Sequence, residues 1–260
     1  MTDAQRERFI RRIYGSQEFI NGISRFCLWI EDGHLREAIA IPVLNKRIEA
    51  VRALRLASPD IGARTILAKR PHQLKIMRIG QVWTIVSPRT SSENRPFLPV
   101  GLIDRRVALT SEAFGMYDAP LWNMALIASR LHLVWVATVC GKLKTDFRYS
   151  NTLGWNTFPV PMLTEQNRAD LTACAENILL AREAHFPKTI ADLYAPDTMP
   201  DNLRRAHERN DEVLERIYIG RRFRNDTERL EKLFDLYIRM TADAAGKPTA
   251  KKASSRRKRS

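Results

Sequence analysis

The stretch that decides the organisation of this chain is NTFPVPMLTEQNRADL, residues 156–171, in which two prolines stand one residue apart before a helical pattern. Each proline fixes its own φ and favours an extended residue before it, so residues 158–161 predict a stiff connector. Thr164 suits the N-cap of the following helix, and Glu165 places negative charge in its first turn. Asn167 stands where a capping box uses Glu or Gln, so we expect an imperfect box. An ordinary loop-to-helix junction fits the same local pattern.

The charge of the chain is strongly basic and unevenly distributed. Lys and Arg number 43 against 29 Asp and Glu, a formal net charge of +14. Residues 1–163 hold 23 basic and 13 acidic side chains, and residues 164–246 hold 13 and 16. Residues 247–260 hold seven basic side chains and no acidic one. Such a distribution favours a polyanionic partner, with nucleic acid first and an anionic membrane surface second.

Several classes of protein are excluded by composition. No run approaches eighteen uncharged apolar residues, so we expect no membrane span. The N-terminus is polar and lacks the apolar core of a signal peptide. Cys27, Cys140 and Cys174 are far apart and form no C-x-x-C pair, which argues against zinc and against a disulfide framework. We therefore predict a reduced, cytoplasmic protein with no metal site.

Residues 1–163 mix helical and strand-like patterns. We expect a helix over 3–14, a hairpin turn at Asn21-Gly22 and a strand over 26–30 that is buried on both faces. Apolar residues at helical spacing over 45–57 predict an amphipathic helix. The outer face of that helix is basic and comprises Arg47, Arg52 and Arg55.

Further strands are predicted over residues 75–79, 82–87, 97–103 and 107–111. The apolar run 121–139 predicts one long buried helix, because its length and alanine content disfavour a strand. After the double proline, apolar stripes predict three helices that pack as a bundle, over 165–185, 201–218 and 226–243.

The predicted fold class is therefore α+β. A mixed α/β domain, residues 1–163, is followed by a small C-terminal helical bundle, residues 164–246. Residues 247–260 have no apolar periodicity and are predicted to be a disordered basic tail, which could contact phosphates without reading a sequence.

Recognisable catalytic motifs are missing. The chain contains no glycine-rich phosphate loop, no G-x-G-x-x-G and no Walker lysine. It contains no G-x-S-x-G elbow, and its five histidines are scattered without ligand spacing. We predict no catalytic residue in this chain.

Four stretches carry a family resemblance. They are YGSQEFINGISRFCLWI (14–30), SSENRPFLPVGLI (91–103), VCGKLKTDFRYSNTLGWNTFPVP (139–161) and HFPKTIADLYAPDTMPDNLRRAHERNDEVLERIY (185–218). Their order resembles the C-terminal part of the adenine-specific DNA methyltransferases of Type IIL (MmeI-like) restriction–modification enzymes. The resemblance implies a target recognition domain followed by a helical region. The double-proline junction also resembles that of Type I specificity subunits, which implies that residues 158–161 join a DNA-reading module to a helical spacer.

The chain departs from the family where catalysis is concerned. The family's Asn-Pro-Pro-aromatic motif and its glycine-containing cofactor loop are absent, and so is its nuclease motif, a Pro-Asp followed by Glu-x-Lys. The resemblance therefore implies the recognition part alone. S-adenosylmethionine would be bound by a methyltransferase catalytic domain or subunit elsewhere, so no cofactor is expected in this chain. The implied partners are that catalytic part and double-stranded DNA, with no membrane.

The run KLKTDFRYSN, residues 142–151, supplies the side chains that DNA reading needs. Arg and Lys suit guanine, Asn suits adenine, Asp suits cytosine, and Lys, Thr and Arg suit phosphates. We expect Arg148 to read a base and Lys144 to hold a phosphate, with Asp146 either accepting from cytosine or orienting Arg148. A solvated loop is the alternative. The DNA-contact set predicted here is Lys142, Lys144, Thr145, Asp146, Arg148, Tyr149 and Asn151.

A second run, PRTSSENRP (88–96), offers Arg89, Ser92 and Arg95 as further DNA contacts. In this run Glu93 and Arg95 could instead pair with each other and shape the loop. Arg25 is a third candidate, whereas Trp29 is expected in the core.

The function implied by the resemblance is sequence-specific recognition of double-stranded DNA for an adenine-specific methyltransferase. Two rivals remain. One is a methyltransferase that is catalytic in its own right, against which the missing motifs argue. The other is a scaffold that binds nucleic acid through charge without reading its sequence.

Overall fold

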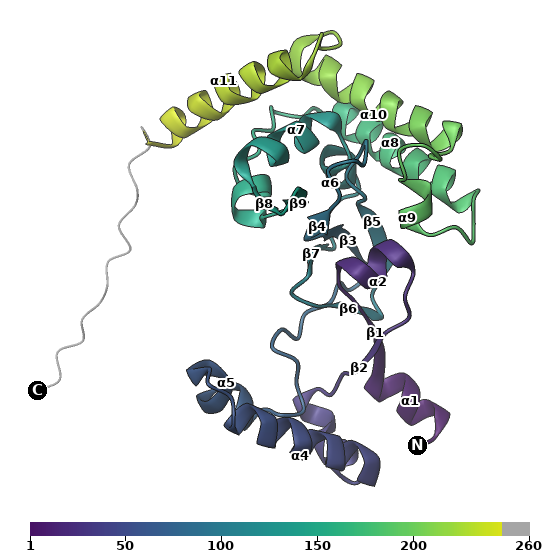
Figure 1. Ribbon diagram of the computed structural model, residues 1–260, viewed down its shortest axis with the longest axis vertical. Helices are drawn as coiled ribbons and strands as arrows, with labels where there is room; N and C mark the ends of the chain where they lie inside the picture. Colours follow the sequence, from purple (N-terminus) through teal and green to yellow (C-terminus); the bar gives the residue numbers. More distant parts are fainter. Residues whose placement is uncertain (246–260) are drawn as a thin grey trace, which may run out of the picture.

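The computed structural model describes residues 1–245 (Figure 1). In this part of the chain the strands form three small sheets of three strands each. Helices α8 (Glu165–Glu183), α10 (Asp201–Ile219) and α11 (Asp226–Ala245) lie at one end of the molecule, and α4 (Pro42–Leu56) and α5 (Ile61–Thr65) lie at the opposite end. The segment predicted to be a disordered tail, 247–260, lies outside the described residues. The predicted α+β class with a C-terminal helical region is confirmed.

The first sheet has β1 (Ile10–Tyr14) at its centre. Strand β2 (Phe26–Leu28) pairs with it antiparallel, and β6 (Val107–Leu109) pairs with it parallel. The predicted helix over 3–14 is therefore too long, because only α1 (Asp3–Phe9) is helical. The hydrogen bonds of two ladders outweigh the local helical pattern after Phe9, since a central strand pairs along both of its edges.

The predicted hairpin at Asn21-Gly22 is wrong. Residues before it form a helix, α2 (Ser16–Asn21), and Gly22 ends that helix with φ +65°. A left-handed residue serves a hairpin turn and a helix C-cap equally, so the dipeptide alone could not distinguish them. The strand over 26–30 is also corrected: it ends at Leu28, and Phe26 on its edge is 57% exposed.

The second sheet is antiparallel, with β3 (Trp83–Pro88) between β5 (Gly101–Asp104) and β7 (Ala113–Tyr117). The strand predicted over 82–87 is thus confirmed. The one predicted over 97–103 begins only at Gly101, and the one over 107–111 corresponds to β6 of the first sheet. Residues 75–79 form no strand, so that prediction is wrong.

Residues 31–73 form a small outlying helical part near the N-terminus (Figure 1). Its core joins Phe9 and Ile30 to Leu44 and Ile48. The predicted helix over 45–57 is confirmed, but Arg55 does not belong to a basic outer face: its guanidinium donates to three backbone carbonyls, 2.7–2.8 Å away. The elements here are η1 (Asp32–His34), α3 (Leu35–Ile39), α4 (Pro42–Leu56), α5 (Ile61–Thr65) and η2 (Leu67–Lys69).

The apolar run 121–139 forms two helices rather than the one predicted. Helix α6 (Trp122–Ile127) ends before Ser129, and α7 (Arg130–Val139) begins after it. The Ser129 hydroxyl accepts from the backbone N–H of His132. A serine that caps a helix supplies a start signal, and here it divides an otherwise continuous apolar pattern.

The three C-terminal helices occur where they were predicted, as α8 (Glu165–Glu183), α10 (Asp201–Ile219) and α11 (Asp226–Ala245), with the short α9 (Ile190–Leu193) between the first two. Thr164 caps α8, and its capping box with Asn167 is complete: each side chain accepts from the other's backbone N–H at 3.1 Å. The expectation of an imperfect box was wrong, because the asparagine carbonyl reaches as well as a glutamine would.

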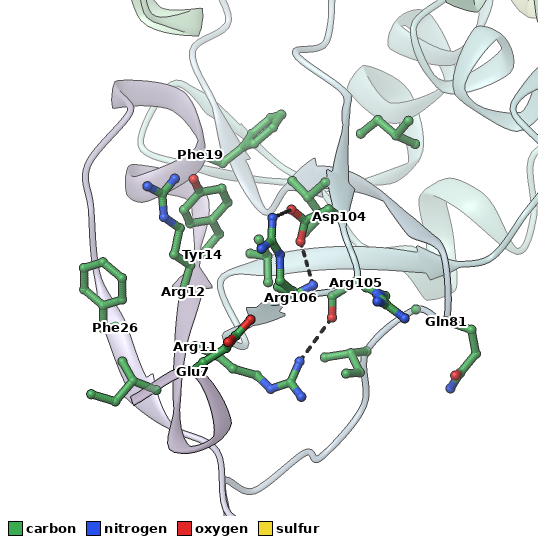
Figure 2. A pocket seen from close by; sticks show the side chains of 16 residues that line it. Glu7, Arg11, Arg12, Tyr14, Phe19, Phe26, Gln81, Asp104, Arg105 and Arg106 are labelled. Atoms are coloured by element: carbon green, nitrogen blue, oxygen red, sulfur yellow. Dashed lines mark hydrogen bonds and ion pairs between the residues drawn. The ribbon is translucent and has the colours of Figure 1, made fainter. Parts of the chain in front are cut away.

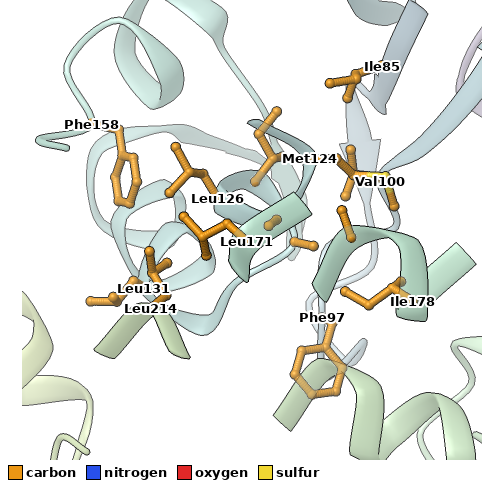
Figure 3. Packing of buried hydrophobic residues seen from close by; sticks show 14 of the residues in the cluster. Ile85, Phe97, Val100, Met124, Leu126, Leu131, Phe158, Leu171, Ile178 and Leu214 are labelled. Atoms are coloured by element: carbon orange, nitrogen blue, oxygen red, sulfur yellow. The ribbon is translucent and has the colours of Figure 1, made fainter. Parts of the chain in front are cut away.

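Helices α8 and α10 pack on each other, and this helical region also shares a core with the preceding part of the chain. Helix α8 packs on both α10 and α6, and α11 packs on α7. One hydrophobic cluster runs from Ile85 of the second sheet through Met124 of α6 to Leu171 and Leu214 (Figure 3). The connector joins this packing too, since the Tyr218 hydroxyl donates to the Pro159 carbonyl at 2.7 Å. The connector therefore fixes the two parts by burial as well as by stiffness.

None of the helices within residues 1–245 has the length and apolar character that crossing a membrane would require.

Candidate nucleic-acid interface

The run KLKTDFRYSN forms a β-hairpin that we call the reading hairpin, residues 141–148. Strands β8 (Gly141–Leu143) and β9 (Asp146–Arg148) pair antiparallel around a turn at Lys144 and Thr145. Lys144 has φ +57°, and both turn residues are exposed. The turn thus projects a cation and a hydroxyl into solvent from a fixed backbone.

The structure brings the two predicted DNA-contact runs together. Strand β4 (Thr90–Ser91) adds to the hairpin, with Thr90 opposite Arg148 and Ser91 opposite Phe147. The Tyr149 N–H donates to the Arg89 carbonyl at 2.7 Å, which continues this pairing. Runs that lie more than forty residues apart in the sequence therefore form a single surface.

The base of the reading hairpin is anchored in the core. Tyr149 is 4% exposed and its hydroxyl forms a 3.0 Å hydrogen bond with Nε2 of His132 on α7. Burial raises the pKa of Tyr149 and lowers the pKa of His132 to about 3, so both groups are neutral near pH 7.

The predicted DNA contact of Tyr149 does not fit its burial, so the residue is an anchor instead. The sequence contained a signal for this burial. Side chains alternate between the two faces of a strand, so Phe147 and Tyr149 lie on the face opposite to the exposed Arg148.

Arg148 and Lys144 are the hairpin cations that have no ion pair within the described residues. Both are exposed. Lys142 differs, because its Nζ lies 2.9 Å from Glu93 Oε2 and 5.8 Å from the Phe147 ring. The pairing of Glu93 with Arg95 that the sequence left open does not form, and Lys142 takes the place of Arg95.

The side chains of Arg95 and Arg89 form hydrogen bonds within the protein instead of projecting into solvent. Arg95 is half-buried and donates to the Ser91 hydroxyl at 3.3 Å. Burial lowers the pKa of Arg95, and the Asp146 carboxylate opposes that effect. Asp146 thus acts electrostatically on Arg95, and within the described residues it has no ion pair with Arg148. Arg89 donates to the Ser111 carbonyl at 3.1 Å.

The remaining predicted residues lie at the edge of this surface or away from it. The Ser92 hydroxyl accepts from the Asn94 N–H at 3.3 Å, which shapes the loop after β4. Asn151 is exposed at the start of the π-helical turn η3 (Asn151–Trp155). Arg25 is not part of this surface: it precedes β2 of the first sheet and forms a 3.0 Å ion pair with Glu18.

A groove at the first sheet contains arginines that the sequence analysis did not select. Arg11 and Arg12 of β1 face Arg105 and Arg106 of the β5–β6 turn across a space of about 1020 Å³ (Figure 2). Two Arg-Arg doublets were the signal in the sequence, but nothing local indicated that they would meet. We call this feature the arginine groove.

No group of three or more His, Cys, Asp and Glu side chains within residues 1–245 could hold a metal ion. The three cysteines are free thiols.

Comparison with known proteins identifies both parts of the chain. Residues 1–162 match the family model for the target recognition domain of MmeI, and residues 163–245 match the model for the MmeI C-terminal domain. The chain is 38% identical over 233 residues to DNA methyltransferase A of Bacillus subtilis (strain 168), an alignment that covers 90% of this chain and 26% of that protein.

A solved structure has the same fold. It is the Type IIL restriction-modification enzyme MmeI in complex with DNA, with a TM-score of 0.86, 31% sequence identity, and coverage of 93% of this chain and 34% of that one. The chain thus spans about a quarter to a third of the length of these relatives. The resemblance that the four sequence stretches indicated is confirmed, and the chain belongs to the MmeI family, carrying its target recognition and C-terminal domains.

Proposed function

We propose that this chain is the sequence-specific, double-stranded DNA recognition module of an adenine-specific DNA methyltransferase of the restriction–modification type. The observation that carries the proposal is the reading hairpin: exposed Arg148 and Lys144 without ion-pair partners in residues 1–245, on strands anchored by a buried tyrosine. Base reading needs side chains that project from a rigid support, because a loosely held donor cannot select one base pair. The family supplies the context, since a solved member is described in complex with DNA.

Within this surface we assign separate roles. Arg148 reads a guanine, since its guanidinium can donate two parallel hydrogen bonds to the O6 and N7 acceptors. Lys144 holds a phosphate from the turn, and Thr145 beside it can donate to the same backbone. Asp146 stabilises the charged form of Arg95, whose guanidinium donates to the Ser91 hydroxyl of β4. Lys142, Ser92 and Asn151 lie at the periphery and contribute positioning contacts.

The catalytic part is proposed to lie outside this chain. This chain covers only 26% of the length of its relative DNA methyltransferase A. The arginine groove does not suit S-adenosylmethionine, because four arginines line it and the cofactor carries a positive sulfonium. We therefore assign the cofactor to a methyltransferase domain or subunit that acts with this chain, in the cytoplasm.

The test is binding-site selection by this chain joined to a methyltransferase partner. The wild type should select one sequence. Arg148→Ala should relax the preference at one base pair and leave nonspecific affinity nearly unchanged, whereas Lys144→Ala should weaken binding to all sequences. Arg239→Ala, an exposed ion-paired position on α11, serves as the control and should change neither. Unchanged stringency in Arg148→Ala and Lys144→Ala would show that the hairpin is structural.

The second candidate is a scaffold that binds nucleic acid through charge alone, which the net charge of +14 favours. Competition separates the two. If unrelated duplex and RNA compete as well as the selected duplex, then binding is nonspecific and the recognition role fails.

A further inference from the structure

The arginine groove is built by pairing between distant strands. Strand β1 lies parallel to β6, with Arg12 opposite Val107, so the β5–β6 turn and its arginines lie beside β1. Figure 2 shows the four arginines around the groove, with Phe26 at the left of the view and Gln81 at the right. The result is a concave, positively charged surface on the first sheet, separate from the sheet that holds the reading hairpin.

The positive charge of the groove is largely uncompensated. Arg12 and Arg105 are exposed and have no ion pair with any other residue between 1 and 245. Arg106 lies 3.4 Å from Asp104, but the two side chains are 75% and 53% exposed, so water screens the pair. Glu7 is the other carboxylate of the lining. Two guanidinium groups therefore remain available to an anion.

Arg11 gives the groove a fixed floor. Its Nη1 donates to the Arg105 carbonyl at 3.3 Å, and its guanidinium lies 5.2 Å from the centroid of the Trp29 ring. Its Nε is buried and has no hydrogen-bond partner among the described residues. Stacking and one hydrogen bond hold this cation in place before any ligand arrives, which reduces the entropy lost on binding.

We propose that the arginine groove binds the sugar-phosphate backbone of the DNA duplex whose bases the hairpin reads, on the flank of the recognised base pairs. This inference rests on the proposed function. Guanidinium groups match phosphate oxygens in geometry and charge, and contacts to phosphates set position without reading sequence. Residues 1–163 carry the surplus of basic charge, so the groove extends that surplus away from the hairpin.

Strand β3 sets the distance between the two surfaces. Its Trp83 end pairs with Asp104, next to the groove, and its Pro88 end leads into β4 and the hairpin. The five steps from Trp83 to Pro88, at about 3.4 Å each, place the two ends of β3 about 17 Å apart. A DNA strand rises about 3.4 Å per nucleotide, so this corresponds to about five base pairs. The groove contact should therefore require DNA beyond the selected sequence.

The experiment compares two duplexes that contain the selected site, one ending at the site and one extended by about twelve base pairs on each side. The wild-type chain should bind the long duplex more tightly. Arg12→Gln with Arg105→Gln should abolish that gain, leave affinity for the short duplex unchanged, and lower the log–log salt slope on the long duplex by about 1.8, which is about 0.9 per lost phosphate contact. The selected sequence should stay the same.

The control is Arg36→Gln, an exposed arginine of α3 outside the groove, which should retain the gain. A double variant that keeps the length-dependent gain and the salt slope overturns the proposal. So does a double variant that binds both duplexes normally but no longer associates with the methyltransferase part, because the groove would then be a protein interface. Failure of the proposed function is distinguishable, since the wild type would then select no sequence at all.

Discussion

Arginine serves different purposes in the two parts of this chain. Within the described residues, five of the 18 arginines in 1–163 form ion pairs, against eight of the 11 in 164–245. In the helical part most of these pairs lie within one helix or between a helix and the loop after α10, and Arg229 joins α11 to Glu215 of α10. In the recognition part most of the arginines face solvent or brace backbone carbonyls.

A basic run in a sequence is therefore not by itself a site for polyanions. Residues 221–224 read Arg-Arg-Phe-Arg, yet all three arginines lie within 4 Å of a carboxylate oxygen of Glu212 or Glu228. The Arg-Arg doublets at 11–12 and 105–106 look similar in sequence, but fewer carboxylate side chains lie near them. What decides availability is the carboxylate that the fold places opposite each guanidinium.

The largest expected effect comes from breaking a buried pair of the helical part. Arg229→Ala should lower the free energy of unfolding by about 3–5 kcal/mol, because it leaves an uncompensated carboxylate at Glu215, which is 2% exposed. Urea unfolding followed by circular dichroism measures this loss. Arg224→Ala, whose side chain is 80% exposed, is the matched control and should have a far smaller effect. Equal losses in both variants would contradict the distinction between buried and exposed pairs.

Lowering the pH should destabilise the fold through His132, which forms a neutral buried pair with Tyr149 beneath the hairpin. The pKa of His132 is lowered to about 3 by burial, whereas in the unfolded chain it is about 6.5. Between these values only the unfolded state binds the proton, so this contribution to stability is complete above pH 6.5 and decreases as the pH falls toward 3. From pH 6.5 to 5 the decrease should be about 2 kcal/mol.

Urea unfolding at several pH values measures this dependence. His132→Leu should reduce the pH slope in this range by about one proton, although it also removes the hydrogen bond to Tyr149. His207 is buried as well and its pKa is lowered, so a residual slope is expected in the variant. An unaltered slope in His132→Leu would mean that this histidine does not control the acid response.

A substitution at the hairpin should change the base selectivity of DNA binding without changing the stability of the fold. Arg148→Ala should reduce discrimination at one base pair by about 1–3 kcal/mol, and since the side chain is exposed, its unfolding free energy should stay within about 0.5 kcal/mol of the wild type. Competitive binding with single-base variants of the selected site measures the discrimination. A large loss of stability would instead place Arg148 among the structural arginines.

The smallest effect is expected at an exposed pair of the helical part. Arg239→Ala removes an i,i+4 ion pair with Asp235 on α11, and both side chains are substantially exposed. The unfolding free energy should change by less than about 0.5 kcal/mol, and the salt dependence of DNA binding should not change. A reduced salt slope would place α11 at the DNA and weaken the comparison between the two parts.

The boundary predicted at residues 163 and 164 remains a prediction of domain organisation. The core cluster passes from Ile85 to Leu171 across this junction, so the physical division is weaker than the change in sequence texture suggests. Replacing Leu171 by alanine would test it, because a shared core should unfold in one transition.

The sequence by itself determined the features that depend on neighbouring residues. The C-terminal helices, the cap at Thr164 and the helix over 45–57 follow from spacing and capping within about four residues. The uneven distribution of charge and the family resemblance were likewise visible in the chain alone, and they led to the prediction, still to be tested, that the run 142–151 contacts DNA.

Only the tertiary structure decided which distant segments meet. Strand β1 replaced part of a predicted helix because β2 and β6 pair with it, and Gly22 ended a helix rather than forming a hairpin. Tyr149 became an anchor because His132 lies opposite it, and two arginine doublets formed a groove because β1 pairs with β6. The physical reason is that ladders and burial depend on partners far away in the sequence, which no local pattern of residues specifies.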